Sequence, residues 1–234
     1  MSKPPLHAVM FDLDGTLLDT APDLIAALNR LRVEHQLPEL PAALIRPSVS
    51  NGARALVELG FGVTDSDASY ESLRQRLLDL YMLDVARYST LFPGLDALLL
   101  QLQAQGIGWG IATNKPALYT EALLAQLQLE PAPALVICPD HVSRRKPDPE
   151  SLILAARHFG CEPMHMAYVG DHLRDIECGR LAGATTIACA YGYIEEGDSI
   201  DSWQADYIVE RGDQIWPLLV QHFAVNTVAT NIIQ

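Results

Sequence analysis

Two carboxylates separated by one residue stand at the end of an apolar run near the start of the chain. Residues 8–11 show no helical period and lead directly into Asp12 and Asp14, which Gly15 and Thr16 follow. A short apolar run that ends in polar residues is typical of a buried parallel strand. Side chains two apart on a strand point to the same side, so both carboxylates can face one small volume. Because these charges repel each other, we expect a hard cation with oxygen ligands, Mg²⁺, to join them.

Two other interpretations of this acidic pair have to be weighed. In a calcium loop the glycine would come two places later than Gly15, and a helix, not an apolar strand, would lead into the loop. Alternatively, Asp12 and Asp14 are simply solvated acids at a strand end, which is common for an isolated doublet. The rest of the chain decides between these interpretations, because a metal site needs further polar groups at the same place.

Composition limits the classes of protein and partner. The chain has 234 residues, is 49% hydrophobic and carries a formal charge of -13. This acidity argues against a nucleic acid or an anionic membrane as partner, whereas a small phosphorylated metabolite requires only local cations. We expect a cytoplasmic protein, because no apolar run has membrane-spanning length and no signal-peptide core is present. The four cysteines lack paired spacing, which predicts reduced thiols.

Residues 18–88 have the pattern of helices alone. Thr20, Pro22 and Asp23 predict a helix start, and the apolar spacing that follows predicts a helix to about residue 35. A second, longer helix is predicted over about 66–87. No segment in this region has the pattern of a strand, so we expect an all-helical cap domain over residues 18–88, inserted into a catalytic core of residues 1–17 and 89–234.

Strands and helices alternate along the remainder of the chain. This alternation predicts an α/β fold, with a Rossmann-like, mostly parallel sheet and helices on both faces. The pattern does not give the order of the strands in the sheet. The strands predicted after the cap are residues 107–112, 134–138, 166–169, 185–189 and 206–209.

Polar residues follow several of these predicted strands. The carboxyl ends of parallel strands meet at one edge of the sheet, so we expect the polar residues to gather there. Each has an alternative role: Lys146 continues a basic run that is usually solvated, Thr113 and Asp171 are suited to capping helices, and Asp175 can pair with a neighbouring arginine. The residues in question are Asp12, Asp14, Thr113, Lys146, Asp171 and Asp175.

Together, these segments resemble the four motifs of the haloacid dehalogenase-like (HAD) hydrolase superfamily in type and order. The first motif is the Asp-x-Asp-Gly-Thr stretch at residues 12–16, and the second is the strand-end Thr113. The third is Lys146 before a proline, and the fourth is Gly-Asp-x-x-x-Asp at residues 170–175. The helical stretch between the first two motifs resembles the small cap of such enzymes. Members that cleave carbon-halogen bonds generally lack the second acid, so Asp14 implies the phosphatase branch.

The resemblance implies a chemistry for these residues. Asp12 is expected to attack phosphorus and form an aspartyl-phosphate, and Asp14 to protonate the departing alkoxide and then activate water. Lys146 is expected to link Asp12 to the phosphoryl group, whose oxygens the Thr113 hydroxyl binds. The resemblance also implies how Mg²⁺ is held: by Asp12, Asp171 and the main-chain carbonyl of Asp14, with Asp175 in the inner or outer sphere.

The sequence determines the substrate less well than it determines the fold and the reaction. We expect Arg54, beside the flexible segment 50–52, to bind a substrate anion through its guanidinium, although a surface role is an equal alternative. Asn114 is assigned to substrate binding with it. Segments 50–54, 138–143 and 191–194 resemble a branch of phosphoglycolate phosphatases that includes N-acetylmuramate 6-phosphate phosphatases. Both of these substrates carry a carboxylate, so Arg54 does not separate them.

Two other functions stay open at this point. One is a phosphoryl-transfer isomerase such as β-phosphoglucomutase, which shares the nucleophile and the acid/base residue. The other is a non-catalytic binding module of the same fold, which the full set of acids disfavours. No pattern in the chain predicts an oligomeric state.

Overall fold

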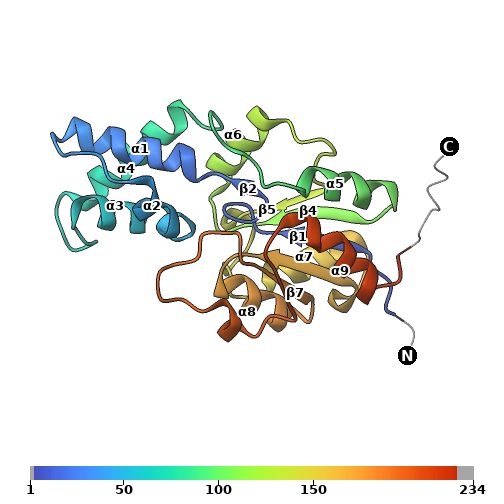
Figure 1. Ribbon diagram of the computed structural model, residues 1–234. Helices are drawn as coiled ribbons and strands as arrows, with labels where there is room; N and C mark the ends of the chain where they lie inside the picture. Colours follow the sequence, from blue (N-terminus) through green and yellow to red (C-terminus); the bar gives the residue numbers. More distant parts are fainter. Residues whose placement is uncertain (1–2, 226–234) are drawn as a thin grey trace.

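The computed structural model describes residues 3–225 and places a parallel sheet beside a group of helices (Figure 1). Within the described residues, six strands pair in parallel in the order β5-β4-β1-β6-β7-β8. After β1, the chain adds β4 and β5 on one side of it and then β6, β7 and β8 on the other. In open α/β sheets, ligands bind where the direction of strand addition reverses in this way. The strands are β1 (Ala8–Phe11), β4 (Gly108–Ala112), β5 (Leu135–Ile137), β6 (Met166–Gly170), β7 (Thr185–Cys189) and β8 (Tyr207–Val209).

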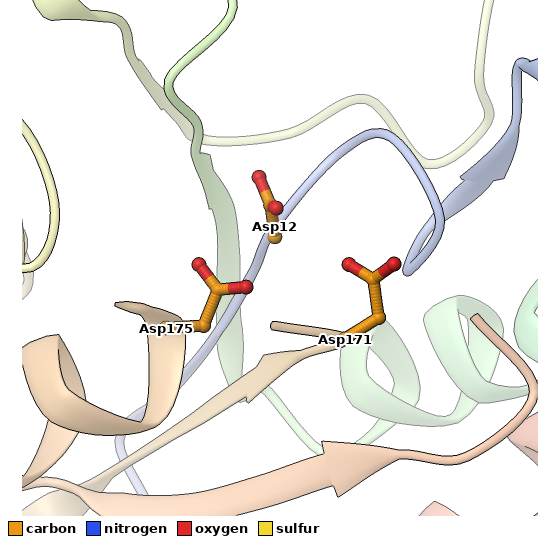
Figure 2. Close-up of side chains that lie close together, drawn as sticks. All are labelled: Asp12, Asp171 and Asp175. Carbon is orange, nitrogen blue, oxygen red and sulfur yellow. The ribbon is translucent and has the colours of Figure 1, made fainter. Parts of the chain in front are cut away.

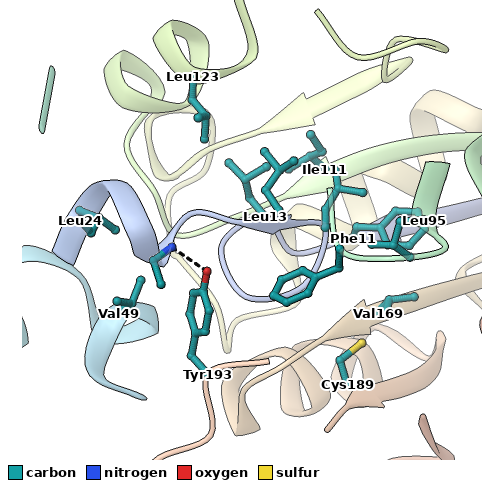
Figure 3. Close-up of a cluster of buried hydrophobic side chains, with 14 of the residues drawn as sticks. Phe11, Leu13, Leu24, Val49, Leu95, Ile111, Leu123, Val169, Cys189 and Tyr193 are labelled. Atoms are coloured by element: carbon teal, nitrogen blue, oxygen red, sulfur yellow. Dashed lines mark hydrogen bonds between the residues drawn. The ribbon is translucent and has the colours of Figure 1, made fainter. Parts of the chain in front are cut away.

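The central strand β1 is buried on both faces, which explains its uninterrupted apolar sequence. Val9 and Phe11 belong to one apolar cluster, and Ala8 and Met10 belong to another on the opposite face. Figure 3 shows part of the first cluster, in which Phe11 lies among side chains from neighbouring strands and helices. A strand covered by helices on both faces has no solvated side, so its polar groups can appear only at its ends.

Helices cover the two faces of the sheet as the sequence predicts. The cluster that contains Phe11 includes side chains from α5 (Leu95–Ala104), α6 (Ala117–Leu127) and α9 (Ile215–His222). The opposite cluster includes side chains from α7 (Glu150–Phe159) and α8 (Leu173–Ala182). The predicted fold class is therefore confirmed. No helix among residues 3–225 is long and apolar enough to cross a membrane, and all four cysteines are free, as expected.

Residues 21–83 contain four α-helices, and one of the predicted helices is too long. The helix expected over about 66–87 spans only Tyr70–Leu83. Before it, the Asp67 carboxylate accepts hydrogen bonds from the Thr64 main chain and hydroxyl, a local turn that competes with helix. After it, Ala86 has a φ of 65°, outside the helical range. The helices are α1 (Ala21–Glu34), α2 (Ala42–Ile45), α3 (Gly52–Phe61) and α4 (Tyr70–Leu83).

Two short strands join this helical unit to the sheet. Strand β2 (Leu18–Asp19) pairs antiparallel with β3 (Thr90–Leu91), so the two connections run side by side. Strand β2 was not predicted from the sequence, because two residues are too few to show a pattern. Asp23 also departs from its predicted capping role: its carboxylate accepts hydrogen bonds from the N–H of Tyr88 and from Ser89. Both contacts tie the start of α1 to the returning chain, and we propose that residues 18–88 act as a cap domain.

Candidate active site

Three buried carboxylates meet at the carboxyl edge of the sheet (Figure 2). Asp12 follows β1, Asp171 follows β6, and Asp175 lies in the first turn of α8. Because β1 and β6 are neighbours, these side chains come together, each offering an oxygen within 4.8 Å of the others. Acids from motifs far apart in the sequence therefore form one cluster.

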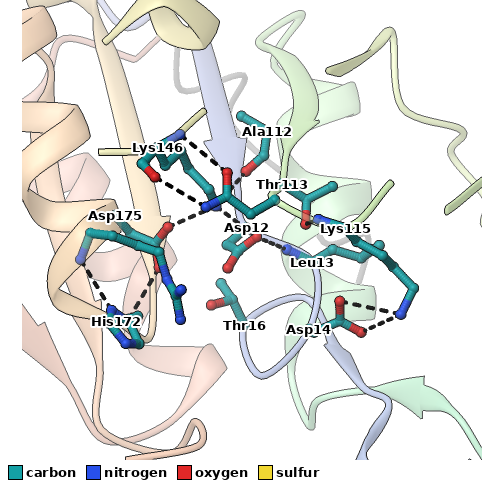
Figure 4. Close-up of polar contacts among 12 residues, drawn as sticks. Asp12, Leu13, Asp14, Thr16, Ala112, Thr113, Lys115, Lys146, His172 and Asp175 are labelled. Atoms are coloured by element: carbon teal, nitrogen blue, oxygen red, sulfur yellow. Dashed lines mark hydrogen bonds and ion pairs between the residues drawn. The ribbon is translucent and has the colours of Figure 1, made fainter. Parts of the chain in front are cut away.

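Lys146 supplies positive charge to this cluster (Figure 4). Its Nζ lies 2.8 Å from Asp12 Oδ1 and 2.7 Å from Asp175 Oδ1. It also lies within hydrogen-bond distance of the Ala112 carbonyl (2.9 Å) and the Tyr168 hydroxyl (2.8 Å). Burial lowers the pKa of Lys146, but the two carboxylates more than offset this and the pKa rises above its ordinary value. Lys146 is thus a buried, charged group and not part of a solvated basic run.

One ammonium does not balance three carboxylates. Burial raises the pKa of Asp171, and the negative charges of Asp12 and Asp175 raise it further. Burial likewise raises the pKa of Asp175, although Lys146 opposes the effect. A group of buried oxygen ligands with uncompensated charge suits a hard divalent cation, so the residues fit the Mg²⁺ that the sequence predicts.

Mg²⁺ is accordingly expected to stabilise the folded protein. A cation present at about 100 times its Kd adds about 2.7 kcal/mol to the free energy of unfolding. For a chain of this size, that corresponds to a rise in Tm of about 5–10 °C, measured by thermal unfolding with and without Mg²⁺. Asp171→Asn should reduce the rise, whereas the same change at the exposed Asp201 should preserve it. Equal rises in wild type and Asp171→Asn would contradict the metal assignment.

Asp171 is held by several donors from other parts of the chain. Thr16 Oγ1 (3.0 Å) donates to its Oδ1, and the Tyr193 N–H (2.9 Å) and Ser50 Oγ (3.1 Å) donate to its Oδ2. Gly15 lies so close, with a φ of +82°, that a Cβ there would collide with the Asp171 carboxylate. This close approach explains the Gly-Thr pair after the acids. Ser50 and Tyr193 lie in segments 50–54 and 191–194, which carry the family resemblance, but their contacts with Asp171 were not predicted.

The side chain of Asp14 lies outside the three-carboxylate cluster. Its Oδ1 accepts hydrogen bonds from Thr20 Oγ1 (2.5 Å) and Lys115 Nζ (3.0 Å), and Lys115 lies 3.4 Å from Oδ2. Asp12 and Asp14 therefore have different partners, which suits different roles in proton and phosphoryl transfer. The contact of Lys115 with Asp14 was not predicted from the sequence. The spacing of Asp12 and Asp14 led us to expect that one cation joins both carboxylates, but the Asp14 carboxylate is not part of the cluster. The contact between the Asp14 main-chain carbonyl and the metal stays a prediction.

Thr113 and Asn114 follow β4, as expected, but Asn114 has an unexpected partner. The buried Thr113 hydroxyl accepts a hydrogen bond from the Lys115 N–H (3.1 Å). The Asn114 side-chain amide accepts from the N–H of Lys146 and donates to its carbonyl, both at 3.1 Å. Both polar atoms of Asn114 thus position the Lys146 backbone, and its substrate-binding role stays a prediction.

The cap residue nominated for the substrate anion is engaged elsewhere. The Arg54 side chain is 63% exposed and pairs with Glu58 (2.9 Å) and Asp65 (3.3 Å). No hydrogen bond or ion pair joins it to the carboxylate cluster in the described structure. Ser50, in the same helical unit, does contact Asp171 through its hydroxyl. The segment 50–52 therefore does reach the site, through Ser50 itself and not through the neighbouring Arg54.

Other contacts fasten the helical unit to the core near the site. Arg46 binds both Asp19 oxygens, at 2.9 and 3.0 Å, and its guanidinium lies 4.9 Å from the centre of the Tyr193 ring. The Tyr193 hydroxyl accepts a hydrogen bond from the Ala21 N–H, which Figure 3 draws as a dashed line. Arg174 of α8 donates to the Ser50 carbonyl (2.8 Å). The helical unit is thus held against the core beside the carboxylate cluster.

Comparisons with known proteins agree with this geometry. A family model described as haloacid dehalogenase-like hydrolase matches residues 9–189. An N-acetylmuramic acid 6-phosphate phosphatase of Pseudomonas putida is 46% identical over 88% of this chain and 92% of its own. A phosphoglycolate phosphatase of Xanthomonas campestris is 40% identical over 90% and 95% of the two chains. The crystal structure of a "predicted phosphoglycolate phosphatase" from Haemophilus somnus has the same fold, with a TM-score of 0.80, 24% identity and coverage of 91% and 97%.

Proposed function

Because the chain belongs to the haloacid dehalogenase-like hydrolase family, we propose that it is a Mg²⁺-dependent phosphatase of small carboxylated phosphate monoesters. The observation that carries this proposal is the buried cluster of Asp12, Asp171 and Asp175 around the ammonium of Lys146. A phosphate monoester repels a carboxylate nucleophile, so its attack requires concentrated positive charge at the nucleophile. Lys146 supplies one positive charge beside Asp12, and Mg²⁺ held by the three carboxylates would supply the rest.

Asp12 is suited to act as the nucleophile through one particular oxygen. Its Oδ1 accepts hydrogen bonds from the Leu13 N–H (2.7 Å) and from Lys146. Its Oδ2 has no hydrogen-bond partner among the described residues, so this oxygen is free to attack phosphorus. Lys146 fixes the orientation of the carboxylate. Bound Mg²⁺, held by Asp12, Asp171 and Asp175, would draw negative charge from the nucleophile and from a phosphoryl oxygen.

Asp14 is suited to proton transfer on the leaving-group side. As the bond from Asp12 Oδ2 to phosphorus forms, the ester bond breaks, and Asp14 donates its proton to the departing oxygen. In the second step Asp14 takes a proton from water while the water oxygen bonds to phosphorus and the Asp12–phosphorus bond breaks. Inorganic phosphate is released, Asp12 is again a carboxylate, and Asp14 again carries the proton that it donated in the first step. Thr113 would bind a phosphoryl oxygen in both steps.

Two substrates are supported by the names of the relatives. We favour N-acetylmuramate 6-phosphate, because the Pseudomonas putida relative of that name is 46% identical. Phosphoglycolate is the second candidate, from relatives at 40% identity. Both compounds combine a phosphate monoester with a carboxylate, which is the chemical class that we propose. We propose the cytoplasm as the place of action.

The substrate is tested by phosphate release from matched pairs of compounds. With Mg²⁺ present, we expect kcat/KM to be at least about tenfold higher for N-acetylmuramate 6-phosphate than for N-acetylglucosamine 6-phosphate, which lacks the lactyl carboxylate. Phosphoglycolate and ethyl phosphate form the second pair. If the carboxylated compound is preferred only in the second pair, phosphoglycolate is the substrate. Isomerised sugar phosphate from β-glucose 1-phosphate, without release of phosphate, would instead identify a phosphoryl-transfer isomerase and overturn the proposal.

A further inference from the structure

A second buried cation lies beside the active site and has no part in the carboxylate cluster. Lys115 is in the loop between β4 and α6, and its side chain is 9% exposed. Its N–H donates to Thr113 Oγ1 (3.1 Å), and its carbonyl accepts from Thr120 Oγ1 (3.3 Å). These contacts fix the backbone of Lys115, so its ammonium is held next to the Asp14 carboxylate, 3.0 Å from Oδ1.

A tyrosine of the helical unit completes the surroundings of this ammonium. The ring centre of Tyr81, on α4, lies 4.7 Å from Lys115 Nζ. Tyr81 is only 2% exposed, and its hydroxyl has no hydrogen-bond partner among the described residues. A buried hydroxyl without a partner costs free energy, and native proteins seldom leave one unpaired. A polar ligand group beside Lys115 would give this hydroxyl a partner.

Lys115 has the capacity and the place to bind a substrate anion. Its ammonium has three N–H donors, and Asp14 is its only carboxylate partner in the described structure. In the proposed reaction Asp14 contacts the ester oxygen, at a hydrogen-bond distance of about 3 Å. Because Lys115 Nζ is 3.0 Å from the same carboxylate, the leaving group must pass close to the ammonium. Arg54, by contrast, is already paired with two acids on the surface.

We propose that Lys115 and Tyr81 form the subsite that binds the carboxylate of the substrate. Lys115 makes the ion pair, and the Tyr81 hydroxyl donates a hydrogen bond from the cap. This inference rests on the proposed function. It assigns the selection of carboxylated esters to Lys115 and Tyr81 instead of Arg54. One partner comes from the core and the other from the helical unit, so a carboxylate bound there would also hold the two together.

The test compares Lys115→Met, Tyr81→Phe and Arg54→Met on the matched pairs of substrates. For the unsubstituted protein we expect a preference for the carboxylated member of a pair. Lys115→Met should reduce that preference about 10- to 100-fold, because a charged hydrogen bond is lost. Tyr81→Phe should reduce it about two- to tenfold, and Arg54→Met should preserve it. The ratio within a pair cancels any general effect of Lys115 on Asp14.

Binding measurements separate this inference from the proposed function. In an Asp12→Asn background with Mg²⁺, calorimetry gives the Kd for each member of a pair, whether or not phosphate is released by the parent protein. Three results would overturn the subsite. They are an equal loss of affinity for both members of a pair in Lys115→Met, no preference for the carboxylated member in the parent, and loss of that preference in Arg54→Met. If Lys115→Met does not fold, Tyr81→Phe decides, because it keeps the ring that contacts the ammonium. Absence of phosphate release with an intact binding preference would overturn only the phosphatase function.

Discussion

Asp12→Asn is expected to abolish turnover, lowering kcat by about 10⁴-fold or more. The amide has nearly the shape of the carboxylate but lacks the negative oxygen that attacks phosphorus. Asp12 Oδ2, the oxygen without a partner among the described residues, is the atom on which the reaction depends. The measurement is steady-state phosphate release with Mg²⁺ and the preferred substrate.

The control for this variant separates loss of chemistry from loss of fold. Removing one of three crowded carboxylates relieves repulsion in the cluster, so Asp12→Asn should unfold cooperatively at a Tm close to that of the parent. Asp201→Asn makes the same change at an exposed position and should retain full activity. A folded Asp12→Asn protein with parental kcat would show that another group attacks phosphorus.

The sheet was predictable from sequence because its strands are buried on both faces. A run such as residues 8–11, apolar at every position, has few other interpretations when polar residues follow it immediately. Strand order was not predictable, since β1 pairs with β4 and β6, which are both remote in the sequence. The short pairing of β2 with β3 was missed for a similar reason: only the folded chain brings residues 18–19 beside 90–91.

The site was predictable where chemistry and strand ends coincide, and not elsewhere. Asp12 and Asp171 carry motifs at strand ends, and the structure brings them together. Lys115 has the local pattern of a surface cation, because its partner Asp14 lies 101 positions away. Tyr168 has the pattern of a core residue in a strand, although its hydroxyl contacts Lys146 and Asp175. Such roles depend on tertiary contacts that spacing does not encode.

Lys146→Met is expected to reduce both stability and activity. Lys146 is almost fully buried and pairs with Asp12 and Asp175, so its removal leaves buried carboxylates uncompensated. Loss of one partner of a buried ion pair lowers the free energy of unfolding by about 3–5 kcal/mol. Loss of the charge that orients Asp12 should lower kcat by about 10²- to 10³-fold. Chemical denaturation without Mg²⁺ measures the first effect, and phosphate release with Mg²⁺ measures the second.

The comparison with Arg145→Met tests whether burial or local sequence determines the role of Lys146. Arg145 precedes Lys146 in the same basic run but is exposed, so its loss should change stability by less than about 0.5 kcal/mol. Mg²⁺ should restore part of the stability of Lys146→Met, because the cation compensates the same carboxylates, and should affect Arg145→Met as it affects the parent. If both variants were destabilised equally, or if Mg²⁺ stabilised Lys146→Met no more than the parent, the ammonium would not be balancing the cluster. The basic run would then act as a solvated surface, and the proposed orientation of Asp12 by Lys146 would be wrong.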